Sequence, residues 1–147
     1  MEKPFVLLAD DNEATCTLIQ ALLRNDFVVE IASDGNEAIE KLKSGQYAAI
    51  LLDLLMPVVD GYGVLDHLAA ERPDHLSRVL VVTASLSARE MQRLRKYTVC
   101  TVISKPFDVE VLLHEVRQCA GIDDGPFLRA PLLSSGMLLF LADLLRH

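Results

Sequence analysis

Apolar residues follow two alternating spacings along residues 1–120 of the chain. Short apolar or β-rich runs predict β-strands at Phe5–Ala9, Phe27–Ala32, Ala48–Leu52, Arg78–Thr83 and Thr98–Ile103. Between and after these runs, apolar residues recur at helical spacing, as they do at Val109, Leu112, Leu113 and Val116. The pattern therefore predicts five strands and five helices in strict alternation.

Strand and helix signals together indicate how these elements are arranged. The central runs are apolar at every position, which is typical of a sheet covered on both faces and hence of a parallel sheet. Asp34-Gly-Asn-Glu37 and Ser87-Ala-Arg-Glu90 have the form of capping boxes, and Asp108 is an expected cap of the last helix. In a parallel sheet of this kind, ligands gather at the carboxyl ends of the strands.

Composition narrows the class of protein. Hydrophobic residues make up 51% of the 147 residues, enough for a core. The net charge of −7 argues against a charge-driven grip on nucleic acid or on an anionic membrane. No apolar run approaches the roughly 18 residues that a membrane span needs, and the N-terminus is unlike a signal peptide. We therefore expect a cytoplasmic protein with no membrane span.

The cysteines point the same way. Cys16, Cys100 and Cys119 are odd in number and far apart, which predicts reduced thiols in a cytosolic protein. No CxxC pair or His/Cys cluster supports a zinc site.

A turn-rich stretch beginning at Gly121 suggests three parts: a domain at 1–120, a linker at 121–131 and an apolar helical tail at 132–147. Residues 121–147 are too few for a DNA-binding or enzymatic output domain, so we expect a single-domain regulator or part of a longer protein. The tail is expected to cover its apolar face on the fourth and fifth helices or, preferably, in a homodimer.

Chemistry-bearing residues follow four of the five predicted strands. They are Asp10, Asp11, Asp53, Thr83 and Lys105. Crowded carboxylates repel one another unless a cation intervenes, and oxygen-only ligands suit Mg²⁺. A hydroxyl and an ammonium opposite the metal can bind the oxygens of a phosphoryl group. This set permits attack by a carboxylate on phosphorus, giving an aspartyl phosphate.

Four motifs carry a family resemblance: Leu7-Leu-Ala-Asp-Asp11, Leu51-Leu-Asp53-Leu-Leu-Met-Pro57 followed by Asp60-Gly61, Val81-Val-Thr-Ala84, and Ser104-Lys-Pro-Phe107. Together they resemble the receiver domain of bacterial two-component response regulators over about residues 4–120. The resemblance implies a flavodoxin-like (βα)5 fold, a doubly wound parallel sheet with strand order 2-1-3-4-5. It also implies signalling through the fourth helix, fifth strand and fifth helix to a downstream protein partner or output domain, without direct nucleic-acid contact.

The resemblance also implies roles for individual residues. Asp53 would accept a phosphoryl group from a histidine kinase or a phosphotransfer protein, and the chain would catalyse only its own phosphorylation and dephosphorylation. Thr83 and Lys105 would bind the phosphoryl oxygens, and the Lys105–Pro106 bond would be cis. The implied Mg²⁺ ligands are Asp10 (through water), Asp11, Asp53 and the backbone carbonyl of Leu55.

Two positions depart from the family's habit. Val102 stands where the family commonly has an aromatic residue that turns inward when Thr83 moves, and Leu55 stands where some fast-hydrolysing members are polar. Val102 favours the alternative of a phosphorylation-independent interaction module. A haloacid-dehalogenase-type phosphatase would need a second Asp in place of Leu55. A flavodoxin would need a phosphate-binding loop after the first strand.

Overall fold

The computed structural model describes residues 2–122 of the chain. The strands are β1 (Phe5–Ala9), β2 (Val28–Ala32), β3 (Ala49–Leu52), β4 (Val79–Thr83) and β5 (Thr101–Ser104). The helices are α1 (Glu13–Leu23), α2 (Gly35–Ser44), α3 (Gly61–Glu71), the 3₁₀ helix η1 (Pro73–Arg78), α4 (Ala88–Leu94) and α5 (Val109–Cys119). No helix in this part of the chain is long and apolar enough to cross a membrane. Nearly all of the predicted linker, and the whole predicted tail, lie outside the described residues.

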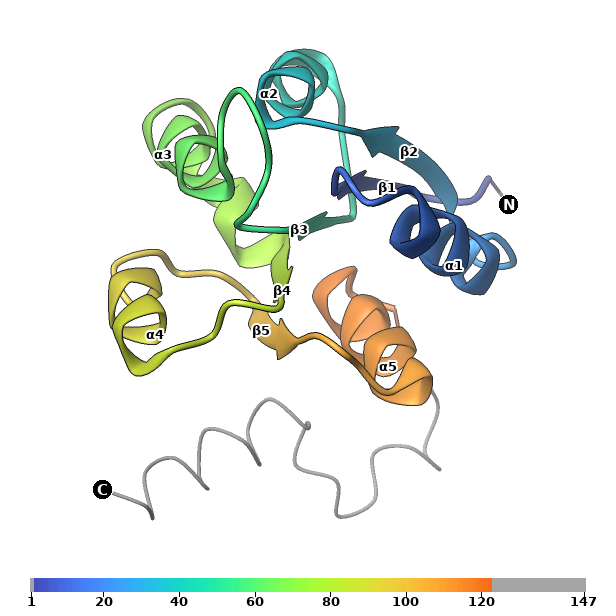
Figure 1. Cartoon of the computed structure of the whole chain (residues 1–147). Coiled ribbons are helices and arrows are strands. Elements are labelled where there is room, and N and C mark those ends of the chain that lie inside the picture. Colours follow the sequence, from blue (N-terminus) through green and yellow to red (C-terminus); the bar gives the residue numbers. More distant parts are fainter. Residues whose placement is uncertain (1, 123–147) are drawn as a thin grey trace.

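All strand pairs are parallel, and the order across the sheet is β2-β1-β3-β4-β5. Helices cover both faces (Figure 1): α1 and α5 lie on one side and α2, α3 and α4 on the other. The predicted flavodoxin-like fold and its strand order are confirmed.

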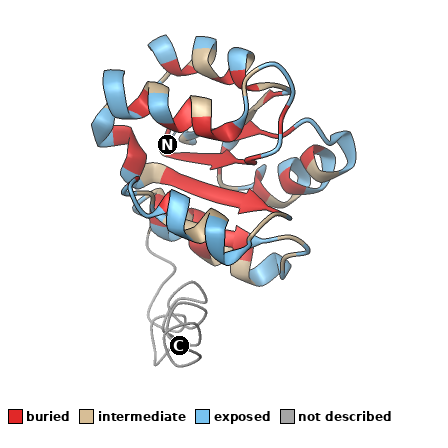
Figure 2. Cartoon of the chain, turned by 60° about the vertical axis from the view of Figure 1, so that its left-hand side comes forward, coloured by how far each residue is buried: buried red, intermediate tan, exposed pale blue. Residues whose placement is uncertain are grey.

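The core divides into two layers because successive side chains of a strand point to opposite faces. On β1, Leu7 packs with the α2–α3–α4 side, whereas Val6 and Leu8 pack with the α1–α5 side. Figure 2 shows the result: the central strands β1, β3 and β4 are buried almost throughout, the edge strands β2 and β5 are only partly buried, and each helix buries one stripe. Burial on both faces explains why the central strands are continuously apolar.

The predicted caps are confirmed at Asp34 and Asp108, whose side chains accept backbone N–H groups in the first turns of α2 and α5. At α4 only half of the predicted capping box forms. Ser87 Oγ accepts the Glu90 N–H, but the Glu90 carboxylate accepts a hydrogen bond from the hydroxyl of Tyr62 instead of turning back to the cap.

The prediction of reduced thiols is wrong for two of the three cysteines. Cys100 and Cys119 form a disulfide, whereas Cys16 is free and buried. Nineteen positions separate the bonded pair, but α5 runs back along β5, so that their Cα atoms lie 5.9 Å apart. This distance is within the range that a disulfide spans. The spacing along the chain gives no sign of this proximity.

Candidate functional site

Three carboxylates meet where β1 and β3 end. Ala9 and Leu52 are partners in the parallel register, so the residues that follow them, Asp10 and Asp53, share one edge of the sheet. The Asp53 N–H donates to the Ala9 carbonyl at 3.0 Å, which extends the ladder to Asp53. One oxygen each from Asp10, Asp11 and Asp53 lies within 4.8 Å of the others. The structure therefore brings the three predicted acids together.

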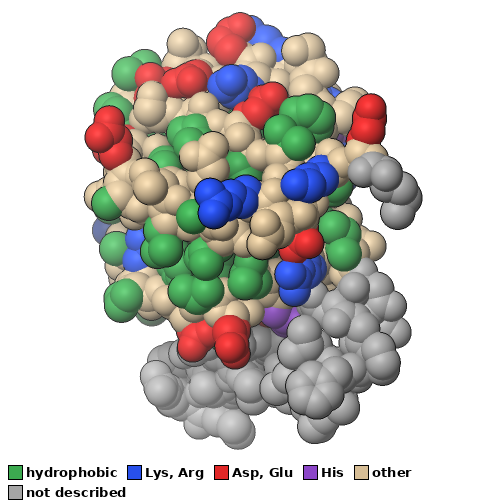
Figure 3. Space-filling model, turned by 90° about the vertical axis from the view of Figure 1, so that its right-hand side faces the viewer, with side chains coloured by type: hydrophobic (Ala, Val, Ile, Leu, Met, Phe, Trp, Pro, Cys, Tyr) green, Lys and Arg blue, Asp and Glu red, His purple; other side chains and the backbone are tan. Residues whose placement is uncertain are grey.

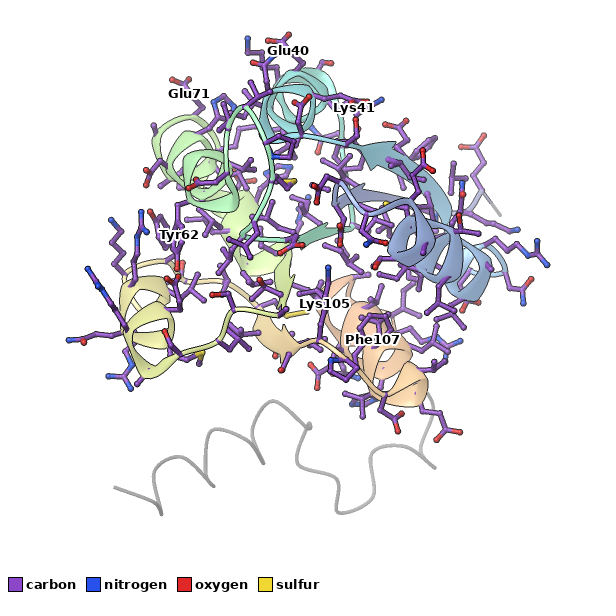
Figure 4. All side chains as sticks on the ribbon, viewed as in Figure 1. Glu40, Lys41, Tyr62, Glu71, Lys105 and Phe107 are labelled. Atoms are coloured by element: carbon purple, nitrogen blue, oxygen red, sulfur yellow. A yellow bond between two sulfur atoms is a disulfide. The ribbon has the colours of Figure 1, made fainter. Side chains whose placement is uncertain are left out.

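Lys105 joins this cluster from the end of β5. Its Nζ donates to Asp10 Oδ2 at 2.7 Å and to Asp53 Oδ2 at 3.0 Å. Figure 4 shows its side chain pointing away from α5 towards the loops beyond β1 and β3. The backbone N–H of Lys105 donates to the Thr83 carbonyl at 3.0 Å, and the Lys105–Pro106 bond is cis, as predicted.

The electrostatics of the site follow from this arrangement. Burial lowers the pKa of Lys105, but its hydrogen bonds to Asp10 and Asp53 and their negative charges outweigh that effect, so the pKa is raised above its usual value. Burial, reinforced by the charge of Asp10, raises the pKa of the Cys16 thiol to about 11. Lys105 is thus a cation and Cys16 a neutral thiol near neutral pH.

Thr83 and Leu55 lie at the site in different ways. Thr83 closes β4, is fully buried, and accepts the Ser85 N–H on its hydroxyl at 3.4 Å. The Leu55 N–H donates to Asp53 Oδ1 at 3.2 Å, which leaves Oδ2 of that carboxylate to Lys105. Leu55 is 61% exposed, so it stands at the solvent-facing side of Asp53.

The loop between β3 and α3 depends on two special backbone positions. Val58 has φ of 68° and is 82% exposed, a left-handed conformation that is uncommon for a β-branched residue. A Cβ at Gly61 would lie 2.5 Å from the Asp53 carbonyl oxygen, so only glycine fits there. Asp60 then caps α3 by accepting the Gly63 N–H. The sequence analysis noted Asp60-Gly61 only as part of a motif. It did not predict the left-handed backbone at Val58 or the close approach of the chain at Gly61.

Two tyrosines occupy the α3–α4 side, where Val102 takes the place of an aromatic residue. The Tyr97 hydroxyl donates to Asp66 at 2.5 Å, and the Tyr62 hydroxyl donates to Glu90. The Arg93 guanidinium lies 3.6 Å from the centroid of the Tyr62 ring. Figure 4 shows Tyr62 extending from α3 towards α4. Hydroxyl hydrogen bonds therefore connect α3 to α4 and to the residues just after α4, a feature that the sequence pattern did not indicate.

Residues 6–117 match the family model described as the response regulator receiver domain. The chain belongs to this family. Receiver domains of two-component systems bind Mg²⁺ in an acidic pocket of this kind. Within the described residues, the only group of three or more acids, histidines or cysteines close enough to hold a metal is this receiver's Asp10, Asp11 and Asp53. Hard oxygen donors around one point suit that ion.

Among curated proteins, this receiver is similar to the transcriptional regulatory protein ZraR of Klebsiella oxytoca. The two are 28% identical over 141 residues, which cover 93% of this chain and 31% of ZraR. It is also 27% identical to the transcriptional regulatory protein TcrA of Mycobacterium tuberculosis, over 90% of this chain and 51% of TcrA. The chain thus spans about a third to a half of the length of these relatives.

Solved structures give the same result. The receiver domain of sensor histidine kinase PA1611 from Pseudomonas aeruginosa, with a magnesium ion coordinated in its active-site cleft, is 26% identical. Its TM-score is 0.73, and the match covers 82% of this chain and 99% of that one. The receiver domain of Francisella response regulator 1452 is 26% identical with a TM-score of 0.71, covering 81% and 98%.

Proposed function

We propose that this receiver is a phosphorylation-activated switch of a phosphorelay, in which Asp53 accepts a phosphoryl group from a histidine kinase or a phosphotransfer protein. The observation that carries the proposal is the bridge from Lys105 Nζ to both Asp10 and Asp53 beside a third carboxylate. Asp53 is only 7% exposed. Its Oδ2 is bound by Lys105, whose side chain is partly exposed to solvent.

Magnesium fits the donor set. Asp10 (through water), Asp11, Asp53 and the backbone carbonyl of Leu55 would hold the ion. When bound, Mg²⁺ supplies positive charge that offsets the negative charge on the phosphoryl oxygens. The cluster already needs such charge, because three carboxylates with oxygens within 4.8 Å of one another repel.

The remaining steps belong to side chains of this chain. An Asp53 oxygen attacks phosphorus while the bond from phosphorus to the donor's imidazole nitrogen breaks and its electron pair stays on the imidazole. The Leu55 N–H orients Asp53 through Oδ1. Lys105 exchanges part of its contact with Asp53 for a contact with a phosphoryl oxygen. The Thr83 hydroxyl, which accepts the Ser85 N–H in this structure, turns to donate to a second phosphoryl oxygen.

The signal would leave through α4, β5 and α5 to a downstream protein partner or output domain in the cytoplasm. Thr83 is paired with Ser104 in the register of β4 and β5, so a movement of Thr83 acts directly on the strand between α4 and α5. We also propose that the receiver domain ends near residue 120, where α5 ends, and that the following segment contributes to a homodimer.

Acetyl phosphate with Mg²⁺ tests the assignment. The wild-type chain should gain one phosphoryl mass that hydroxylamine removes, and Asp53→Asn should gain none. Asp74→Asn is the matched control, because Asp74 is an exposed acid on η1 far from the cluster in the sequence and should label normally. Labelling that persists in Asp53→Asn, or that is undiminished when the metal is removed by a chelator, would overturn the assignment.

Val102 supports a second candidate, a receiver that binds its partner without phosphorylation. The α3–α4 tyrosines already hold α4 in one position through hydrogen bonds to Glu90 and Asp66. Under this alternative, Asp53→Asn would bind the downstream partner as tightly as the labelled wild-type chain. Partner binding that rises with labelling and is lost in Asp53→Asn would exclude it.

A further inference from the structure

The disulfide lies at the opposite end of β5 from the acidic site. Cys100 immediately precedes β5, and Cys119 is the last residue of α5. At about 3.3 Å per residue, Cys100 lies roughly 13 Å along the strand from Ser104, which precedes Lys105. The bond therefore ties the end of one signalling element to the start of its neighbour, outside the phosphorylation chemistry.

The two sulfurs differ in how a reagent in solution meets them. Cys100 is an exposed residue, whereas Cys119 is 9% exposed and packs in the apolar layer beneath α1 and α5. Cys119 also lines a surface cavity of about 560 Å³ beside Phe5 and Arg78. Because Cys100 is the more exposed partner, we take its sulfur as the one that an incoming thiolate attacks, with Cys119 as the leaving group.

We propose that Cys100–Cys119 is a reversible thiol–disulfide switch, opened by a small thiol and closed by a small disulfide, that sets how freely α5 moves against β5. The inference rests on the proposed function in one respect, namely that the protein signals in the cytoplasm. Disulfides in cytoplasmic proteins are usually transient or redox-sensing. Its location in the α4–β5–α5 output surface is what makes it regulatory.

The exchange balances in two steps. A thiolate attacks Cys100 Sγ, forming a mixed disulfide, while the bond to Cys119 Sγ breaks and its electron pair stays on that sulfur, which takes a proton. A second thiolate attacks the sulfur of the first small thiol and releases Cys100 as a thiolate, which also takes a proton. Two small thiols are oxidised to one disulfide, and the protein bond is reduced to two thiols. The reverse sequence closes the bond.

Opening the bond leaves α5 with weaker attachments. Its apolar face still packs through Leu112 and Val116, and Arg117 pairs with Asp26 at 2.7 Å in a half-exposed contact. Neither attachment links the end of α5 to the start of β5. The redox state therefore alters the last turn of α5 while leaving the Lys105 bridge unchanged.

The experiment uses the full chain in buffers of reduced and oxidised glutathione. Free thiols are alkylated after denaturation and counted by mass: the oxidised chain should carry one label, on Cys16, and the reduced chain three. Native amide exchange of residues 116–122 should rise about tenfold or more on reduction, and to the same level in Cys100→Ser without reductant. Cys16→Ala is the matched control and should keep the redox response.

Three results would overturn the proposal. The native bond could resist excess reduced glutathione and open only after denaturation, which would make it a structural staple. The chain could keep three free thiols in oxidised glutathione. The exchange of residues 116–122 could be equal in both states. None of these readouts involves a phosphoryl group. A wild-type chain that gains no phosphoryl mass would therefore refute the proposed function and leave the redox result intact.

Discussion

Removing the charge of Lys105 should destabilise the metal-free protein far more than removing a surface lysine. Lys105→Met keeps most of the apolar stem and deletes the ammonium that bridges Asp10 and Asp53. The carboxylates are then left buried and unpaired, a change that typically costs about 3–5 kcal/mol.

The distances give a magnitude for the Lys105→Met variant. Two unit negative charges 4.8 Å apart, the outer limit for the oxygens in this cluster, repel by about 3.5 kcal/mol at an effective dielectric constant of 20. We expect a loss of about 3 kcal/mol at pH 7.

Urea unfolding with chelator, and again with millimolar Mg²⁺, measures this loss. Mg²⁺ should restore most of the stability, because the ion replaces the missing charge. The matched control is Lys43→Met, whose ion pair with Glu40 is exposed and should contribute at most about 1 kcal/mol. If both variants lose the same stability, or if Mg²⁺ leaves the Lys105→Met deficit unchanged, the electrostatic reasoning is wrong.

Three further predictions concern the loop beside the acceptor and the tyrosines. Leu55→Asn should shorten the lifetime of the phosphorylated chain without slowing labelling, since a polar side chain there can orient water; an unchanged or longer lifetime contradicts this. Val58→Gly should raise the unfolding free energy by about 0.5–1 kcal/mol, because relief of a φ of 68° exceeds the entropy cost of glycine; a lower urea midpoint would refute it. Burial and hydrogen bonds to carboxylates raise the pKa of Tyr62, of Tyr97 (to about 12) and of Tyr47, whose hydroxyl donates to Glu30, so their stabilisation should hold up to pH 10 and decline above it; tyrosinate absorbance at pH 10 in the folded chain would contradict this.

The sheet could be predicted because its signals are local. The central strands β3 and β4 are short apolar runs that are buried on both faces, so the pattern and its cause coincide there. The start of β5 shows where this fails: the predicted strand begins at Thr98, but ladder pairing begins only at Thr101, opposite Leu80. Residues before it bend towards α4, and β-rich composition alone does not mark that boundary. The 3₁₀ helix η1 was missed for a similar reason, since Pro73 signals the end of α3 but does not indicate that a new helical turn begins there.

The acids and Lys105 could be predicted to converge because parallel strands bring their carboxyl ends to one edge. What the topology does not specify is which atoms pair. The bridge from Lys105 to Asp10 spans 95 positions, and the link from Tyr62 to Glu90 spans 28. The first joins residues of one predicted edge, whereas the second depends on how far α4 tilts over α3, which no local pattern encodes.

The surface away from the acidic edge shows a second limit of prediction from the sequence, which concerns the burial of apolar side chains. Figure 3 looks onto the side of the molecule that carries α1, where hydrophobic side chains lie exposed among lysines and arginines. Leu18 on α1 is 46% exposed although it fits the helical apolar stripe, because Cys16, Ile19 and Leu23 already cover the sheet there. Periodicity predicts that a helix has an apolar face but not how much of that face the sheet can accept. On α1 the sheet accepts Cys16, Ile19 and Leu23 and leaves Leu18 facing solvent.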